Sequence, residues 1–263
     1  MSLTGALSNA LTGLNAASWG AQIVSSNLAN AGTAGYGRRD LALSALTADA
    51  QGGVRVTAVT RQVNAALLTD RRHAQAGFAH GDALSQALTA LETRLGLPGE
   101  AGSLQDRIAR FEASLVSAAS QPESDLRLRQ VLGSAQDVVQ GLNAAGDTVQ
   151  ALRAEADRGI ATMVARLNDG LTRVADLNTR ITAGRAAGQS TAALEDARQA
   201  AIDGIADIVP LRAIARPLGK VALVSEGGAL LLDGRAPEYG FQPRGTMAAH
   251  LSLAAGDLSG LTR

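Results

Sequence analysis

The first 37 residues of this 263-residue chain contain no charged side chain, yet small and apolar residues recur in them at heptad spacing. Positions spaced alternately three and four apart lie on one face of a long helix. The remaining positions hold Ser, Thr, Asn, Gln and Gly, whereas an exposed helix ordinarily uses charge to stay soluble. We therefore predict a helix over residues 3–32 that is surrounded by other protein. Its candidate assembly interface comprises Leu3, Leu7, Ala10, Leu14, Ala17, Ala21, Val24 and Leu28.

Trp19, the only tryptophan, lies in the same predicted helix. It is either a contact within the protein's own core or an anchor against a neighbouring subunit, where tryptophan is enriched. Both interpretations stay open from the sequence, and Trp19 is included among the candidate interface residues.

Composition narrows the classes of function. Aromatic residues make up 2% of the chain against 46% apolar residues, which suits close-packed helices better than a deep ligand pocket. The 24 basic residues equal the 24 acidic ones, which argues against nucleic acid and against an anionic membrane surface as partners. The chain has no cysteine, so disulfides and thiolate metal sites are excluded. No stretch is apolar enough for membrane insertion.

An ordered motif runs through the uncharged segment. It reads SNALTGLNAA over residues 8–17, SSNLANA over 25–31 and TAGYGRR over 33–39. This motif resembles the N-terminal signature of the axial proteins of the bacterial flagellum, the family of rod, hook and hook-associated proteins. Within that family the chain looks most like the hook-associated proteins of the hook–filament junction. The candidate residues of the family turn motif are Asn27, Asn30, Thr33, Gly35, Tyr36 and Arg38.

The resemblance implies a structural role with several partners. It implies self-assembly into a ring or tube, contact with the hook protein and a second junction protein, and a flagellar export chaperone as a further partner. It also implies an extracellular location on the flagellum, reached through the flagellar channel without a cleaved signal peptide. Family members end in a second heptad helix that is missing here before Arg263, so we expect a truncated chain.

The periodicity predicts a mainly α fold with a long N-terminal heptad helix, an elongated helical bundle and a small antiparallel β-hairpin region near the C-terminus. Ser103 and Asp106 have the spacing of a helix-capping box. Glycines at 141 and 146 make a break or a kink plausible in the longest helix. Helices are expected over 62–95, 103–120, 128–181 and 191–208. Strands are expected over 41–46, 54–59, 211–216, 221–225, 229–232 and 239–242.

Four domains follow from this pattern. They are an axial helix and turn (1–37), a short β connector (38–60), an elongated helical bundle (61–208) and a β-hairpin region that begins a further domain (209–263).

No catalytic constellation is present in the sequence. His73 and His80 could share a helix face with Asp70 or Asp82 as metal ligands, but the set is incomplete and two solvated histidines are the favoured interpretation. No metal, cofactor or catalytic residue is therefore assigned, and the protein is not expected to be an enzyme.

Two pairs of adjacent arginines, Arg38-Arg39 and Arg71-Arg72, could face phosphate. Because the net charge is zero, solvated faces or ion pairs are the favoured interpretation.

The leading hypothesis is a structural adaptor at the hook–filament junction. A flagellar rod or hook subunit shares the motif, but the family pattern places a largely β body after it, where this chain has a helical pattern from 62 to 208. From another class, a helical ligand-binding or enzyme domain is weakened by the missing site. A signalling coiled coil is disfavoured by the turn-rich motif.

Overall fold

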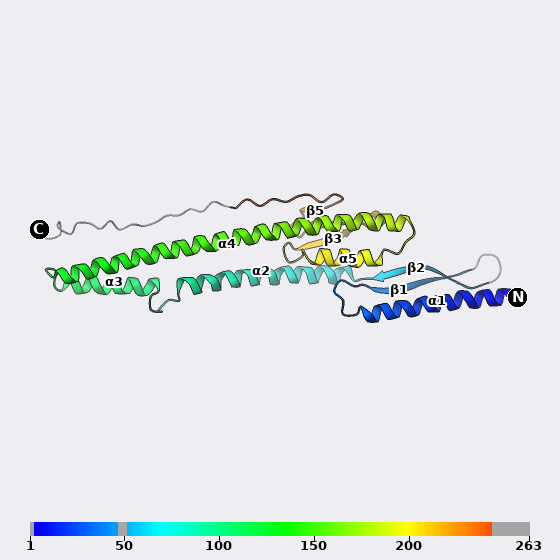
Figure 1. Ribbon diagram of the computed structural model, residues 1–263, viewed down its shortest axis with the longest axis horizontal. Helices are drawn as coiled ribbons and strands as arrows, with labels where there is room; N and C mark the ends of the chain where they lie inside the picture. The colour runs from blue at the N-terminus through cyan, green and yellow to red at the C-terminus, as the bar shows by residue number, and fades with distance from the viewer. Residues whose placement is uncertain (1–2, 47–51, 244–263) are drawn as a thin grey trace. The chain divides into compact units, whose positions relative to one another are not determined.

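The computed structural model describes residues 3–46 and 52–243, and it confirms a mainly α fold with small antiparallel sheets (Figure 1). The predicted truncation lies outside the described residues. Within these ranges the helices are α1 Leu3–Ala29, α2 Ala65–Leu95, α3 Leu104–Ala119, α4 Asp125–Ala186 and α5 Ala192–Asp203, with a short 3₁₀ helix over Pro217–Gly219. The strands are β1 Arg38–Ala45, β2 Val54–Gln62, β3 Leu211–Ala215, β4 Val221–Ser225 and β5 Leu230–Leu232. None of the described helices is long and apolar enough to cross a membrane.

Internal contacts divide the chain into two compact units, and α2 and α4 each contribute to both. The first unit joins the segment up to His80 with Met163–Gly240, and the main part of the second is Gly81–Thr162. The division into four domains stays a prediction, because compact units defined by contacts do not test whether each segment folds by itself.

In the first unit, α1 packs along the antiparallel β1–β2 hairpin (Figure 1). The helix face that meets the hairpin is small and polar: Gly5 and Ala16 are buried, and Thr12 Oγ1 accepts a hydrogen bond from the backbone N–H of Val54 at 3.3 Å. Gly53 allows this close approach, because a Cβ on it would lie 2.9 Å from Thr12 Oγ1. The helix therefore covers the hairpin with its small residues and not with its leucines.

The hydrophobic core of the first unit lies between the C-terminal half of α4, α5 and the three-stranded sheet, whose order is β3-β4-β5. The α4 side chains recur at helical spacing and point to the sheet. The buried core residues are Leu167, Leu171, Val174, Ile202, Ile205, Leu211, Leu223, Leu231 and Leu232. Every member of this cluster follows residue 166, so α1 and the β1–β2 hairpin contribute nothing to it.

Gly170 lets α4 approach the chain after α5. A Cβ on Gly170 would lie 2.3 Å from Cγ2 of Ile205, which is itself buried in the core. We expect Gly170→Ala to destabilise the fold by about 1–3 kcal/mol through overpacking. Gly159 is the matched control, because it lies in the same helix with no atom within 4 Å of its added Cβ. Gly159→Ala should stabilise by up to about 1 kcal/mol. Urea unfolding of both variants measures the difference, and equal shifts would contradict the close approach.

In the second unit, α3 lies against the N-terminal half of α4, where Ser114 Oγ and Ser134 Oγ are 2.7 Å apart. The predicted cap of α3 is confirmed: Ser103 accepts a hydrogen bond from the backbone N–H of Asp106 at 3.2 Å. The Asp106 carboxylate in turn accepts from the backbone N–H of Gly102 at 2.7 Å, and this bond holds the pKa of Asp106 below its ordinary value.

The predicted break in the longest helix is wrong, because α4 runs without interruption over Asp125–Ala186. At 1.5 Å per residue it is about 90 Å long. Gly141 has a packing role instead of a breaking one: a Cβ there would lie 2.8 Å from Cδ of Arg107 on α3.

Several limits also differ from the sequence prediction, among them the end of the N-terminal helix, which is at Ala29 and not at residue 32. Residue 62 does not begin a helix but ends β2, where it pairs with Arg38. Helix α5 stops at Asp203, because the chain continues into turns closed by bonds such as Ile208 N–H to Ile205 C=O at 3.2 Å. The strand expected over 239–242 is absent from this described segment. The backbone N–H and C=O of Tyr239 both bond to the side-chain amide of Asn168, each at 2.9 Å, so neither is open to a strand partner.

Candidate assembly interface

The apolar heptad of α1 faces away from the hairpin and is uncovered. All eight predicted heptad residues are exposed, and Leu14 retains 68% of its surface. The opposite face, with Gly5 and Ala16, is buried on the hairpin. A contiguous exposed apolar stripe is characteristic of an interaction surface. The helix therefore has one face for its own hairpin and one face free for another protein.

Trp19 lies beside a cavity of about 860 Å³ that is also lined by β2 and by the loop between α4 and α5. It is 51% exposed and is therefore not a core residue. Its role as an anchor for a neighbouring subunit stays a prediction.

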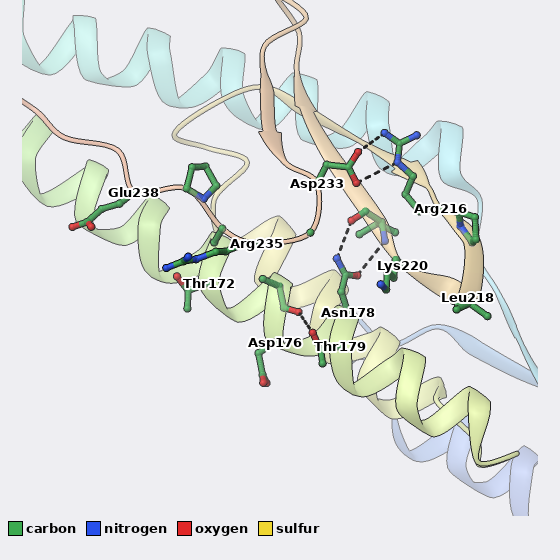
Figure 2. Close-up of a pocket in the computed structure, with 16 residues that line it drawn as sticks. Thr172, Asp176, Asn178, Thr179, Arg216, Leu218, Lys220, Asp233, Arg235 and Glu238 are labelled. Carbon is green, nitrogen blue, oxygen red and sulfur yellow. Dashed lines mark hydrogen bonds and ion pairs between the residues drawn. The ribbon is translucent and has the colours of Figure 1, made fainter.

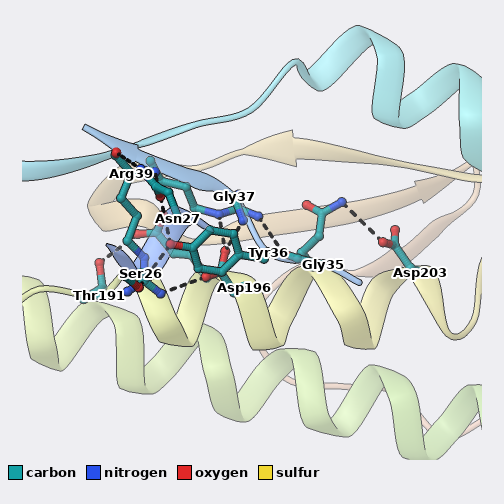
Figure 3. A network of polar contacts seen from close by, with 12 residues as sticks. Ser26, Asn27, Gly35, Tyr36, Gly37, Arg39, Thr191, Asp196 and Asp203 are labelled. Atoms are coloured by element: carbon teal, nitrogen blue, oxygen red, sulfur yellow. Dashed lines mark hydrogen bonds and ion pairs between the residues drawn. The ribbon is translucent and has the colours of Figure 1, made fainter. Parts of the chain in front are cut away.

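The motif residues at the end of α1 and in the turn that follows are connected by hydrogen bonds (Figure 3). The side-chain amide of Asn27 donates to the backbone C=O of Arg39 at 2.8 Å and accepts from its N–H at 2.9 Å. The hydroxyl of Tyr36 donates to the same Asn27 oxygen at 2.9 Å. Asn30 donates to the backbone C=O of Ser26 at 2.9 Å. Thus the end of α1 and the start of β1 are fixed to each other through the motif.

Thr33 extends this set, since its hydroxyl donates to Asn30 Oδ1 at 3.3 Å. The candidate motif residues thus form two directly bonded pairs, Asn27 with Tyr36 and Asn30 with Thr33, and Ser26 lies between them as a partner of Asn30 and Tyr36.

A carboxylate on α5 meets the same turn. Asp196 accepts hydrogen bonds from the backbone N–H of Gly37 at 2.9 Å, from Arg39 Nη2 at 3.0 Å and from Arg61 Nε at 2.6 Å (Figure 3). The Arg39 guanidinium also lies over the Tyr36 ring, 5.0 Å from its centroid. Asp196 is thus the acceptor through which α5 holds the turn and the hairpin.

Two of the three glycines in the turn allow this approach. Gly35 has φ +81°, and a Cβ on it would lie 3.2 Å from Cβ of Ala200 on α5. A Cβ on Gly37 would lie 2.4 Å from Nε of Arg61. The glycines therefore bring the turn against α5 and leave room for the arginine that reaches Asp196.

Arg38 is the arginine that the motif predicts as a site residue, but in the structure it lies away from this network. Arg38 is exposed, and its guanidinium pairs with Asp40, two residues further along β1, at 3.2 Å. Arg39, Arg61 and Asp196 make the joint instead. Of these three residues, only Arg39 could have been found from the sequence, because it lies beside the motif. Asp196 lies 157 residues further along the chain.

A second aspartate on α5 binds the adjacent arginines of α2. Arg72 is 3% exposed, and its Nε donates to Asp203 Oδ1 at 2.8 Å. Arg71 pairs with the other oxygen of Asp203. The arginine pair at 71–72 therefore serves in ion pairs.

The histidines do not form a metal site in the described part of the chain, where no group of three or more potential ligands is found. His73 pairs with Glu226, Nδ1 to Oε2 at 3.3 Å, and both side chains are exposed.

A cavity of about 1300 Å³ lies beside α4 and the chain after β3 (Figure 2). Asn178 fixes this region: its amide donates to the backbone C=O of Val221 at 2.8 Å and accepts from its N–H at 3.1 Å. Arg216 pairs with Asp233 at 2.6 Å. The charged residues of the lining are balanced, with Arg216, Lys220 and Arg235 against Asp176, Asp233 and Glu238. This mixture defines no ligand class.

Glu195, at the start of α5, has a lowered pKa. Burial acts to raise it, but hydrogen bonds from Arg185 at 2.8 Å and from Thr191 at 2.7 Å outweigh the burial. A carboxylate with a lowered pKa in the folded state stabilises the fold above its unfolded pKa of 4.5, and this contribution is lost as pH falls through the folded value. We expect Glu195→Gln to lower the free energy of unfolding at pH 7. Below pH 4.5 the variant and the unchanged chain should differ less, because the unchanged chain then loses the contribution of the Glu195 carboxylate. Urea midpoints of both proteins, measured from pH 7 to below pH 4.5, test this. A difference between the two midpoints that stays the same at every pH would contradict it.

Comparison with known proteins agrees with this architecture. Residues 88–260 match the family model described as the flagellar hook-associated protein FlgK helical domain. The chain is 26% identical over 266 residues to flagellar hook-associated protein 1 of Salmonella typhimurium, covering 96% of this chain and 48% of that protein. It is 24% identical to flagellar hook-associated protein 1 of Escherichia coli, and this match also covers 96% of this chain and 48% of that protein. The chain thus spans about half the length of the curated relatives it matches.

A solved structure shares the fold. The flagellar hook junction protein FlgK from Burkholderia pseudomallei superposes with a TM-score of 0.55 at 21% identity, over 63% of this chain and 29% of that one. The match supports the helical architecture.

Proposed function

Because the chain belongs to the FlgK family of flagellar hook-associated proteins, we propose that it is a structural subunit of the bacterial flagellum and acts as an adaptor at the hook–filament junction. The uncovered apolar heptad of α1 is the observation that carries this proposal, since it offers a long helical surface to other subunits. The Gly35–Tyr36 turn leads from this surface to the helical body. The role proposed is assembly and not catalysis.

The proposal includes several partners. Copies of the chain would pack through Leu3, Leu7, Ala10, Leu14, Ala17, Trp19, Ala21, Val24 and Leu28 into a ring or tube. The hook protein and a second junction protein would bind on either side, an export chaperone would bind before assembly, and the mature location would be extracellular.

A rod or hook subunit is the alternative within the flagellum. The match of residues 88–260 to a helical domain of hook-associated proteins favours the junction, because it covers a region separate from the N-terminal motif at residues 8–39, which resembles rod and hook proteins as well.

A photocrosslinking experiment tests the proposal. Leu14 is replaced by benzoylphenylalanine in the protein expressed from its complete gene, and intact flagella are irradiated and analysed by mass spectrometry. We expect crosslinks to further copies of the chain and to flagellar proteins of the hook region. Leu67 on α2 is the matched control, since it is 65% exposed against 68% for Leu14 but lies outside the heptad. Assembled flagella in which Leu14 captures no neighbour would contradict the proposed interface.

A further inference from the structure

The N-terminal arm, defined as residues 3–62 with α1, β1 and β2, is attached to the body of its own unit in an unusual way. The body is defined as Met163–Gly240. We infer that the Asp196 carboxylate is a releasable joint that sets the orientation of the arm on the body, and that the arm can leave α5 without unfolding either part. This inference concerns the free chain and does not depend on the proposed assembly.

The first observation is that the described residues of the arm and of the body share no hydrophobic core cluster. The nine buried members of the core cluster all lie between Leu167 and Leu232. The arm has its own packing, since α1 covers the β1–β2 hairpin through Gly5 and Ala16. Apolar burial is the main contribution that holds the parts of a protein together. The core cluster gives no such burial between the arm and the body.

The polar contacts are the second observation. Three donors from the arm converge on Asp196: Gly37 N–H, Arg39 Nη2 and Arg61 Nε. Two of these donors are cations, and their side chains are 23% and 13% exposed, against 14% for Asp196. Without the carboxylate, two partly buried guanidinium groups would face each other uncompensated. Movement of the arm away from α5 would return both to water.

The chain itself provides a pivot. Between the described ends of β2 and α2 lie only Val63 and Asn64, which join the arm to α2. Just beyond it, the Arg72–Asp203 ion pair at 2.8 Å holds the start of α2 on α5. Loss of the Asp196 contacts would therefore release the arm about residues 63–64 while α2 stays in place.

Distance measurements between two spin labels test this inference. The chain contains no cysteine, so labels at Ala17→Cys on α1 and Arg173→Cys on α4 are unique. Both positions are exposed. Pulsed electron paramagnetic resonance on the otherwise unchanged chain should give one narrow distance distribution. In Asp196→Lys, which places a third cation at the joint, we expect a distribution at least about twofold wider. Asp196→Asn should give an intermediate width.

Two further variants make the test specific. Arg39→Gln combined with Arg61→Gln removes the cations from the arm side, and it should also widen the distribution. Asp207→Asn is the matched control, because Asp207 pairs with Arg166 at 2.5 Å within the body. Its distribution should stay narrow.

Thermal melts followed by circular dichroism complete the experiment. The melting midpoint of the body should be unchanged in the Asp196 and arginine variants. A narrow distribution in Asp196→Lys would overturn the inference, because other contacts would then hold the arm. A lowered midpoint in both Asp196→Lys and the double arginine variant would also overturn it, because the joint would then be part of the body's fold.

Discussion

A charge on the exposed heptad of α1 is expected to abolish incorporation into the flagellum while leaving the free chain folded. In Leu14→Asp or Ala21→Lys, an ion would lie where the proposed neighbours supply only neutral side chains. A buried unpaired charge costs several kcal/mol, which is enough to exclude a subunit from an assembly. In the free chain Leu14 is 68% exposed, so the folding free energy should change by less than about 0.5 kcal/mol.

Motility and the content of purified flagella report incorporation, and a thermal melt reports folding. Leu67→Asp is the control, since it makes the same chemical change at a side chain that is 65% exposed on α2. It should leave motility intact. Wild-type motility with both heptad variants would show that this face is not packed in the assembly.

The second large effect is expected at Asp203. Its carboxylate pairs with Arg72, whose side chain is 3% exposed and cannot easily turn to water. Asp203→Asn would leave that guanidinium buried without a countercharge. Breaking a buried pair in this way costs about 3–5 kcal/mol. Urea unfolding should show a corresponding loss of stability.

Asp207→Asn provides the comparison for this variant as well, because its pair with Arg166 is exposed. An exposed pair contributes about 0–1 kcal/mol. Replacing Arg72 and Asp203 together, by Met and Leu, should cost less than Asp203→Asn alone, since no unpaired charge remains. Equal losses for Asp203→Asn and Asp207→Asn would show that Arg72 finds another acceptor.

The sequence predicted well those features that depend on local periodicity. The period of three and four placed α1, α2 and α4 and identified the heptad face that the structure leaves exposed. Alternation of residues together with glycine turns predicted β1 to β5 near their observed positions. These signals are local, because each element needs only its own residues to display one face.

The features that failed depend on distant residues. Gly141 was expected to break α4, but Arg107 on another helix fills the space beside it. The segment at 239–242 has a strand-like pattern, yet Asn168 takes both backbone groups of Tyr239. The joint between Arg39 and Asp196 links positions 157 residues apart, and no spacing rule in one sequence pairs them.

Three asparagines in this protein imitate a peptide group, and this has a mechanical consequence. The side-chain amides of Asn27, Asn168 and Asn178 each bond to both the N–H and the C=O of one residue in another segment. A helix that slid by one residue would move by about 1.5 Å, and both bonds of such a pair would be lost together. Each amide therefore resists shear along the helix axis, which apolar packing alone opposes only weakly. Force along α1 or α4 would therefore pass to β1 through Asn27, to β4 through Asn178, and to the segment at Tyr239 through Asn168.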